Sequence, residues 1–295
     1  MDKPIKEYKP KPFLCGLDEI KQDLIIRSQK GDTTYGIEIL DDAVHYIRPA
    51  TVTLIMACPN VGKSLLAQNM ACHIAKQGKK VLFCSCEMTS GLLMERQLKQ
   101  LMALDSKQML ETYEACPSAL DKIFESIQND KQYNYLKNIQ ILDIGGIHIN
   151  QLLQVFDEHQ EFEFIIVDYI QRIKGDGDSE YQQLGDVSYK LQIYAMDNLK
   201  GMIVCSQIPK TIESDNRTQK GVDFTKLRAK GAGNMEEDAH VAIKMAEDIG
   251  PDGQKYVLMH LSKNKYGNVK FLTYKYKIDQ RLNFVKQLGE VIKDA

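Results

Sequence analysis

The feature that most constrains this 295-residue chain is an apolar run that leads through a short loop into a helical segment. Residues Thr51–Ala57 read as a buried strand, and apolar side chains then recur at helical spacing over Lys63–Gln77 until Gly78 ends the pattern. The loop between strand and helix contains Gly62 and runs directly into Lys63 and Ser64. A strand, a glycine-containing loop and a helix in this order place backbone N–H groups at the positive end of a helix, where phosphate groups bind.

The sequence of this loop predicts a nucleotide site of the Walker A type. Lys63 supplies a cation for the β- and γ-phosphates, and the Ser64 hydroxyl is a ligand for Mg²⁺. Ala57 stands where the first glycine of the motif is usual. A chance Gly-Lys-Ser at a helix start is the alternative, and the strand before it and the helix after it favour the nucleotide site. We therefore expect ATP and Mg²⁺, with ATP bound by Ala57, Pro59, Asn60, Val61, Gly62, Lys63, Ser64 and Leu65.

Two further carboxylates follow buried strands. Asp168 ends the apolar run Phe164–Asp168, and such a residue holds Mg²⁺ through its water shell. On its own this pattern is common, but a phosphate loop about a hundred residues earlier strengthens it. Glu87 follows the strand Val81–Cys86, which we expect next to the phosphate-loop strand. Glu87 is either the base that activates water or an acidic charge at the start of the next helix, and its chemistry alone leaves both possibilities open.

Strands and helices alternate along most of the chain, which predicts an α/β fold with a mostly parallel twisted sheet and helices on both faces. The last strands follow one another without helices, so we expect an antiparallel C-terminal edge. We expect residues 1–33 to form an N-terminal tail with a helix, and residues 34–295 to form the ATPase domain. A helix from Ser118, with Asp121 at capping-box spacing, is expected between the second and third strands. The remaining expected strands are Ile139–Ile144, Met202–Ser206, Val241–Met245, Tyr256–Leu261 and Val269–Lys277.

Composition excludes some classes of protein. No apolar run reaches the roughly 18 residues of a membrane span, so we expect no membrane partner and a cytoplasmic protein. The formal net charge of −2 argues against a generally basic nucleic-acid coat. A local basic segment is nevertheless present between the strand ending at Ser206 and the strand beginning at Val241. It contains Lys210, Arg217, Lys220, Lys226, Arg228 and Lys230.

Five segments together resemble the DnaB-type replicative helicases, in the family's order and spacing. They are Ala57 to Ser64 in its Ala-x-Pro form, Ser85-Cys86-Glu87-Met88, Asp168-Tyr169-Ile170-Gln171, Ser206-Gln207, and Thr34-Tyr35-Gly36-Ile37 with Leu40-Asp41. The resemblance runs from about Thr33 to Phe284. It implies a RecA-like motor domain of a phage or plasmid version of the family. It also implies that Glu87 is the catalytic base and that Gln207 senses the γ-phosphate.

The same resemblance implies a ring, as a hexamer of identical chains that moves 5′ to 3′ on single-stranded DNA and unwinds duplex DNA. Primase and a helicase loader are possible further partners. In the family, a Lys-x-Arg pair reaches the ATP site of the next subunit, and here Lys263 and Lys265 occupy both positions. Because lysine lacks the planar fork of arginine, transition-state stabilisation in trans is expected to be weaker. Solvated surface lysines are the alternative.

Two other segments have roles implied by the resemblance. Leu17–Gln29 matches a linker helix that docks on the neighbouring subunit, and a helix packed on its own domain is the alternative. The basic segment resembles the channel loops that grip single-stranded DNA, and a solvated surface loop is the alternative. Few aromatic residues accompany its charges, which favours tracking of phosphates over reading of bases. The DNA-binding residues expected there are Lys210, Arg228, Lys230 and Gly231.

Two other functions stay open at this point. One is a related RecA-type ATPase that pairs or remodels DNA in recombination, because such proteins share the same site chemistry. The other is an ATP-gated DNA-binding assembly module with weak hydrolysis, which Lys265 in place of arginine keeps plausible. Strand displacement on a forked duplex, as opposed to strand exchange on homologous DNA, separates the first alternative from a helicase.

Overall fold

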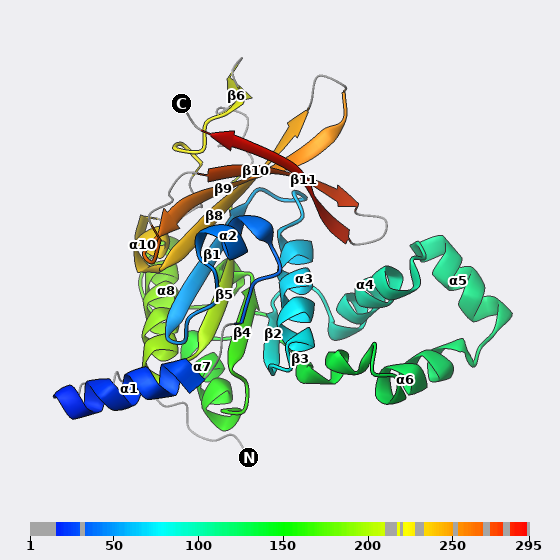
Figure 1. The fold of residues 1–295 in the computed structure, drawn as a ribbon, viewed down its shortest axis with the longest axis horizontal. Helices are drawn as coiled ribbons and strands as arrows, with labels where there is room; N and C mark the ends of the chain where they lie inside the picture. Colours follow the sequence, from blue (N-terminus) through cyan, green and yellow to red (C-terminus); the bar gives the residue numbers. More distant parts are fainter. Residues whose placement is uncertain are drawn as a thin grey trace.

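The computed structural model describes residues 16–29, 33–209, 217–218, 221–227, 233–249, 253–267, 272–279 and 284–293. These residues form an α/β structure around a nine-stranded sheet with the strand order β11-β10-β9-β8-β1-β5-β4-β2-β3. Figure 1 shows the helices on both sides of this sheet. The strands are β1 (Thr51–Ala57), β2 (Val81–Ser85), β3 (Ile139–Asp143), β4 (Phe164–Asp168), β5 (Gly201–Gln207), β8 (Val241–Ile249), β9 (Lys255–Asn264), β10 (Leu272–Asp279) and β11 (Phe284–Lys293).

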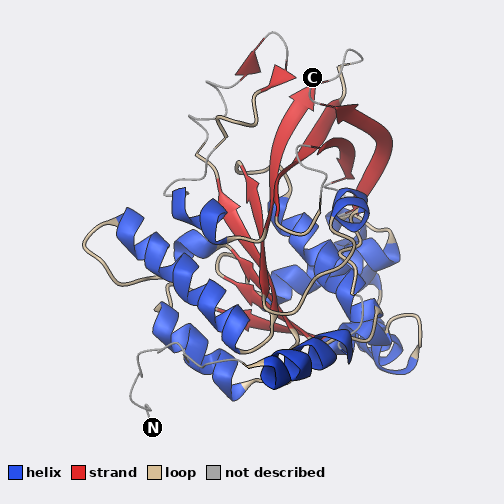
Figure 2. Ribbon diagram, turned by 60° about the vertical axis from the view of Figure 1, so that its left-hand side comes forward, coloured by secondary structure: helices blue, strands red, loops and turns tan. Residues whose placement is uncertain are grey.

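The sheet is parallel from β3 across to β8 and antiparallel from β8 outward. The expected antiparallel C-terminal edge is therefore confirmed. Strand β11 was not predicted, because its alternating pattern is interrupted by charged residues and by Gly289. The expected strand Val269–Lys277 corresponds to β10, and the first residues of that expectation lie outside the described part of the chain. Figure 2 shows these last strands extending beyond the two groups of helices.

Helix α3 (Lys63–Lys76) packs across β1 to β5 on one face, and α7 (Ile149–Glu158) and α8 (Glu180–Asp197) lie on the other (Figure 1). The parallel strands are nearly all buried, with every residue of β1, β2 and β4 covered. This explains why they read as continuous apolar runs. The described helices also include α1 (Leu17–Gln29), α2 (Glu38–Ala43), α10 (Gly233–Asp238) and the short 3₁₀ helices η1 (Asn134–Asn138) and η2 (Ile170–Arg172). No helix in the described part of the chain is long and apolar enough to cross a bilayer.

Three helices connect β2 to β3: α4 (Ser90–Met102), α5 (Ser106–Ala115) and α6 (Ala119–Asn129). They project together from one side of the sheet (Figure 1). The capping box expected at Ser118 is wrong, because the Ser118 side chain makes no capping hydrogen bond although α6 does begin there. The capping box belongs instead to α5, where Asp105 and Gln108 bond reciprocally.

A carboxylate stabilises the turn in the segment before β1. Asp41 accepts hydrogen bonds from the backbone N–H groups of Tyr35 at 2.7 Å and Gly36 at 2.9 Å. Gly36 has φ 74°, and a Cβ placed there would lie 2.4 Å from Cγ of His73. Only glycine fits this turn without strain. The Thr34–Ile37 segment and Asp41 therefore form one structural unit that fixes how the chain approaches β1.

Two short β segments, β6 (Arg217–Thr218) and β7 (Gly221–Val222), pair with each other outside the main sheet. They lie within the basic segment that was expected to bind DNA. Lys210, Arg228, Lys230 and Gly231, the residues expected to contact DNA, lie outside the described residues. Phe224 and Leu227 between them are buried against the domain.

Candidate nucleotide site

The loop that follows β1 is shaped by two residues with positive φ. Asn60 has φ 68° and Gly62 has φ 103°. A Cβ at Gly62 would lie 2.5 Å from Cδ1 of Ile278 on β10, so a larger residue would need both a strained backbone and a shift of the Ile278 side chain. Gly62 is the N-cap of α3, and among the described residues no side chain caps this helix. The first N–H groups of α3 are thus available to an anion.

Lys63 begins α3, and its ammonium group forms a buried ion pair with the Asp168 carboxylate at the end of β4. Burial lowers the pKa of Lys63, and the charge and hydrogen bond of the Asp168 carboxylate, followed by the charge of Glu87, oppose that effect. The neighbouring thiol of Cys205 stays protonated, because burial raises its pKa well above the usual range. Lys63 is therefore a cation held beside a carboxylate at neutral pH. Its ammonium also lies 4.8 Å from the centroid of the Tyr169 ring.

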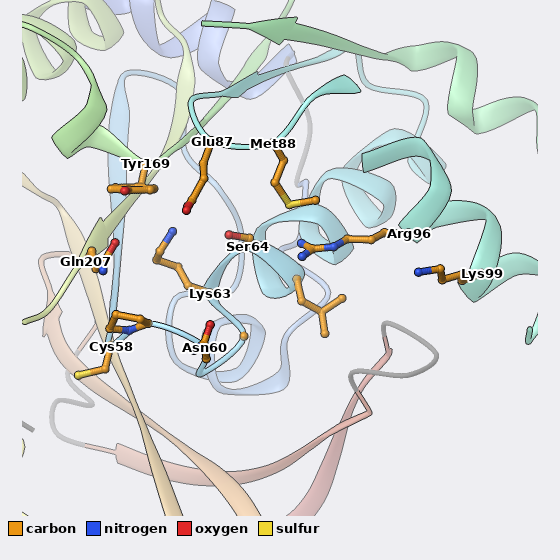
Figure 3. A pocket seen from close by; sticks show the side chains of 13 residues that line it. Cys58, Asn60, Lys63, Ser64, Glu87, Met88, Arg96, Lys99, Tyr169 and Gln207 are labelled. Carbon is orange, nitrogen blue, oxygen red and sulfur yellow. The ribbon is translucent and has the colours of Figure 1, made fainter. Parts of the chain in front are cut away.

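Glu87 is presented by a tight turn after β2. The Ser85 hydroxyl donates to the carbonyl oxygen of Met88 and accepts from the Met88 N–H at 3.3 Å, which closes the turn around Glu87. The Glu87 side chain is exposed, and its carboxylate points toward the tip of Lys63 (Figure 3). The expected position of Glu87 at the mouth of the site is therefore present in the structure.

The expected position of β2 next to the phosphate-loop strand is wrong. β1 pairs with β5 and β8, and both β5 and β4 separate it from β2. Glu87 nevertheless reaches the pocket because the carboxyl ends of all these parallel strands meet at one edge of the sheet. Helix α3, which begins at this edge, lies across the whole set of strands.

A cavity of about 590 Å³ joins these residues, within the range of pockets that hold small organic ligands. Figure 3 shows Lys63, Glu87 and Gln207 directed into it, from the start of α3, the turn after β2 and the end of β5. Of the eight residues expected to bind ATP, Ala57 and Val61 do not line it and belong to the buried core. The lining residues are Cys58, Pro59, Asn60, Gly62, Lys63, Ser64, Leu65, Glu87, Met88, Arg96, Lys99, Tyr169 and Gln207.

Two cationic residues of α4 in the pocket were not predicted from the sequence. Arg96 and Lys99 line the outer part of the pocket (Figure 3), and Lys99 also pairs with Glu95 at 3.0 Å. They are spaced three residues apart, so they share a face of the helix. The available signal was their position beside Leu93, which is buried, on a helix that begins just after Glu87. This position did not predict a role in the site, because basic residues commonly flank the buried face of a helix that is exposed to solvent on its other side.

Lys263 and Lys265 lie at the opposite edge of the sheet. Backbone bonds from Lys265 N to His240 O (3.0 Å) and from His240 N to Val52 O (2.8 Å) place them level with the start of β1. The phosphate loop follows its end at Ala57. At about 3.3 Å per residue, Val52 to Ala57 spans roughly 17 Å. Neither lysine can therefore serve the phosphate site of its own chain.

The two lysines are also used differently. The ammonium of Lys263 donates to the carbonyl oxygens of Glu236 at 2.5 Å and Glu237 at 2.7 Å, at the C-terminal end of α10. Burial and the adjacent charge of Lys265 lower the pKa of Lys263. Lys265 is exposed. Of the two, only Lys265 presents its side chain outward.

Metal binding by protein groups alone finds no support in the described residues. No group of three or more histidine, cysteine, aspartate or glutamate side chains there is placed to hold a metal ion. Ser64 lines the pocket, and Asp168 lies just beneath it in contact with Lys63. These two side chains offer a hydroxyl and a carboxylate, the oxygen donors that suit Mg²⁺ shared with a nucleotide.

Comparisons with known proteins find relatives along most of this chain. The family described as DnaB-like helicase C terminal domain matches residues 33–284. The replicative DNA helicase DnaB of Pasteurella multocida is 26% identical over 220 residues, which cover 72% of this chain and 46% of that protein. A probable plasmid replicative DNA helicase of Chlamydia trachomatis is 26% identical over 246 residues, covering 79% and 50%. The chain thus spans about half the length of the curated relatives it matches.

Solved structures share the fold. The ATPase domain of a phage protein has a TM-score of 0.75 at 20% identity, covering 93% of this chain and 99% of that one. A DnaB-like replicative helicase studied with primase has a TM-score of 0.68 at 19% identity, covering 92% and 66%. A KaiC-like protein of Pyrococcus horikoshii follows with a TM-score of 0.59 at 14% identity, covering 88% and 99%. The expected RecA-like architecture is confirmed, and the chain belongs to the DnaB-like helicase C-terminal domain family.

Proposed function

We propose that this chain is the motor of an ATP-dependent replicative DNA helicase that moves along single-stranded DNA as a ring. One observation carries the proposal: Lys63 at the start of α3, Glu87 after β2 and Gln207 at the end of β5 line the same pocket as the phosphate loop. Family membership supports the same activity. Ring size, taken as a hexamer, and 5′-to-3′ movement rest on the resemblance alone.

The phosphates of ATP are held by the N-terminus of α3 and by Lys63. On binding, the Lys63 ammonium exchanges its contact with Asp168 for the β- and γ-phosphates, so the cation keeps an anionic partner in both arrangements. Arg96 and Lys99 add positive charge at the outer side of the pocket. This arrangement favours a polyanionic ligand over a neutral one.

Ser64 and Asp168 are the residues that would hold Mg²⁺. The fit rests on the chemistry of their oxygen atoms and on the contact between Asp168 and Lys63 at the base of the pocket. When bound, Mg²⁺ neutralises negative charge on the β- and γ-phosphate oxygens. The protein's own part is to keep the Asp168 carboxylate ionised beside a cation and directed toward the phosphate loop.

Glu87 accepts the proton of the water that attacks the γ-phosphate. Its position on a closed turn, exposed and facing Lys63, leaves room for a water molecule between it and the phosphates. Gln207 contacts the γ-phosphate and reports its presence to the segment that follows β5. That segment carries Lys210, Arg228, Lys230 and Gly231, which we propose as the contacts to the DNA backbone.

A second copy of the chain completes the site. Because Lys265 is exposed at the edge opposite its own phosphate loop, it can act only on the nucleotide of a neighbour. Lys263 contributes less directly, since its ammonium holds the end of α10. Helix α1 exposes Leu17 (85%) and Leu24 (60%), and we propose that it docks on the adjacent copy. Primase and a loader remain predictions from the resemblance.

The test is ATP turnover with and without single-stranded DNA, combined with strand displacement on a forked duplex. We expect DNA to stimulate turnover, and Glu87→Gln to lower kcat by about 10²–10⁴-fold while ATP still binds. Glu111→Gln is the matched control, since Glu111 pairs with Lys107 on α5 away from the pocket. A rate of ATP turnover that single-stranded DNA does not change would contradict the proposed motor function. Wild-type turnover by Glu87→Gln would contradict the proposal that Glu87 is the catalytic base.

One observation favours a second candidate. Lys263 is engaged within its own chain and Lys265 offers a point charge, which weakens catalysis in trans. An ATP-gated assembly module predicts that rings form on DNA with ATP while turnover stays slow. Strand exchange on homologous DNA without fork unwinding would instead indicate a recombination ATPase.

A further inference from the structure

A glutamine beyond the end of β4 bonds through its side chain to the backbone of the neighbouring strand β5. β4 pairs with β5 only as far as Val167 and Val204, whereas β5 continues to Gln207. Gln171, in η2, donates from Nε2 to the carbonyl oxygen of Gln207 at 3.1 Å and accepts from the Gln207 N–H at 3.1 Å. Its side-chain amide thus supplies one donor and one acceptor to the backbone groups of Gln207 beyond the last pair of the β4–β5 ladder.

The same amide makes a third contact. Nε2 of Gln171 also donates to the Ser206 hydroxyl at 2.8 Å. Ser206 is fully buried, and Gln171 and Gln207 are half-buried. Three hydrogen bonds from one side chain to two consecutive residues fix the end of β5 relative to η2.

The opposite side of this strand end is bonded to the phosphate-loop strand. Gln207 is in register with Ala57, and the N–H of Ile208 donates to the carbonyl oxygen of Ala57 at 2.8 Å. The backbone of Gln207 is therefore held between β1 and Gln171. Its side chain enters the pocket from this position (Figure 3).

We infer that Gln171 is a positioning residue that couples Gln207 to the end of β4. Asp168 and Gln171 lie on the same short segment, so a displacement of Asp168 when the nucleotide changes also displaces Gln207. The inference rests on the proposed function, because it takes Gln207 to contact the γ-phosphate. Gln171 itself does not line the pocket, and it acts on turnover through Gln207.

A purely structural role makes a different prediction. If Gln171 only stabilises the fold, its loss lowers the melting temperature and affects activity independently of Gln207. If it positions Gln207, its loss slows turnover with little change in ATP binding, and the effect disappears once Gln207 is truncated. A double-mutant cycle separates the two roles.

The experiment compares Gln171→Leu, Gln207→Ala and the double variant in the full chain, with ATP and an oligothymidine strand. We expect Gln171→Leu to lower DNA-stimulated kcat about tenfold and to change KM for ATP less than about threefold. The double variant should be no slower than Gln207→Ala alone. Gln183→Leu is the matched control, because Gln183 also donates a hydrogen bond to a backbone carbonyl (Gly177 O, 3.1 Å) but lies on α8 outside the pocket.

A second variant protects the test against misfolding. Gln171→Glu keeps an acceptor oxygen for the Gln207 N–H and loses both donated bonds, so its kcat should fall between those of wild type and Gln171→Leu. Wild-type kcat in both Gln171 variants, or losses that multiply in the double variant, would overturn the inference and leave the proposed function intact. A wild-type chain without DNA-stimulated turnover would overturn the proposed function, and the inference with it.

Discussion

The two edges of the parallel sheet use their lysines in opposite ways. At the carboxyl edge, Lys63 is buried against Asp168 inside a pocket that collects cations from α3 and α4. At the amino edge, Lys263 is bonded to backbone carbonyls of α10, and Lys265 points outward. The carboxyl edge is therefore arranged to bind a ligand within this chain. The amino edge is instead a rigid turn that exposes one cation to a partner molecule.

The rigidity of the amino edge comes from a buried asparagine. Asn264 donates to the carbonyl oxygen of Ala43 at 2.9 Å and accepts from the Tyr266 N–H at 2.9 Å. The Tyr266 ring stacks on His240, with centroids 6.0 Å apart, and also contacts the Arg48 guanidinium at 4.2 Å. The residues around Lys265 are thus fixed before any partner arrives, which lowers the entropy lost on association.

The largest expected effect comes from a substitution at the carboxyl edge. Lys63→Ala should lower ATP turnover about 1000-fold, or ~4 kcal/mol, because it removes the buried cation at the phosphate site. Turnover and binding of a fluorescent ATP analogue measure the effect, with circular dichroism to confirm folding. Lys107→Ala, on the exposed surface of α5, is the control. Turnover within tenfold of wild type would mean that Lys63 serves mainly to neutralise Asp168.

The next largest effect comes from a substitution at the amino edge. Asn264→Ala should lower the free energy of unfolding by ~2–3 kcal/mol, since the Ala43 carbonyl and the Tyr266 N–H both lose their partner. Urea denaturation measures it, with the exposed Asn129→Ala as control. Because the phosphate site lies at the other edge, ATP binding by the folded variant should stay close to wild type. A variant that lost ATP binding while folded would show that the two edges are coupled within one chain.

A third prediction concerns how pH changes the stability of the amino edge. Burial, and then the charges of Lys265 and Lys263, lower the pKa of His240 to about 4. Its Nδ1 accepts from the Val52 N–H at 3.2 Å, which requires an unprotonated nitrogen. The unfolded chain binds this proton near the ordinary histidine pKa, so stability present at neutral pH is lost as pH falls from about 6.5 toward 4.

Because His240 is only half-buried, solvent screening reduces the size of that effect to ~1–2 kcal/mol. Urea denaturation at pH 7 and pH 5 measures it. His240→Gln should flatten the difference between the two pH values, whereas His45→Gln, at an exposed position, should leave it unchanged. An unchanged pH dependence in His240→Gln would assign the acid sensitivity to other groups.

The smallest effect tests the outward cation. Lys265→Arg should raise DNA-stimulated turnover a few-fold, ~0.5–1 kcal/mol, because a guanidinium binds phosphate oxygens bidentately. Mixing this variant with Lys63→Ala chains in one assembly shows whether the gain is made in trans. A decrease in turnover would indicate that the neighbour's site is shaped for an ammonium group.

Much of the site was readable because its chemistry lies in contiguous residues. The strand, loop and helix around Gly62 and Lys63 are present in the structure as expected, and Asp168 and Glu87 follow their strands at the predicted edge. Local spacing suffices here, since a buried parallel strand, its carboxyl end and the next helix are all set by neighbouring residues. The same reasoning missed α5 with its capping box at Asp105, and it predicted a capping box at Ser118 that α6 does not have.

By itself, the sequence determined the α/β class, the phosphate loop and the likeness to one helicase family. Only the tertiary structure decided that β5 and β4 separate β1 from β2, that Arg96 and Lys99 join the pocket, and that Lys263 is bonded within its own chain. The physical reason is that periodicity records whether a residue is buried and not which partner buries it. Strand order and the pairing of distant charges depend on contacts between residues far apart in the chain, which no local pattern encodes.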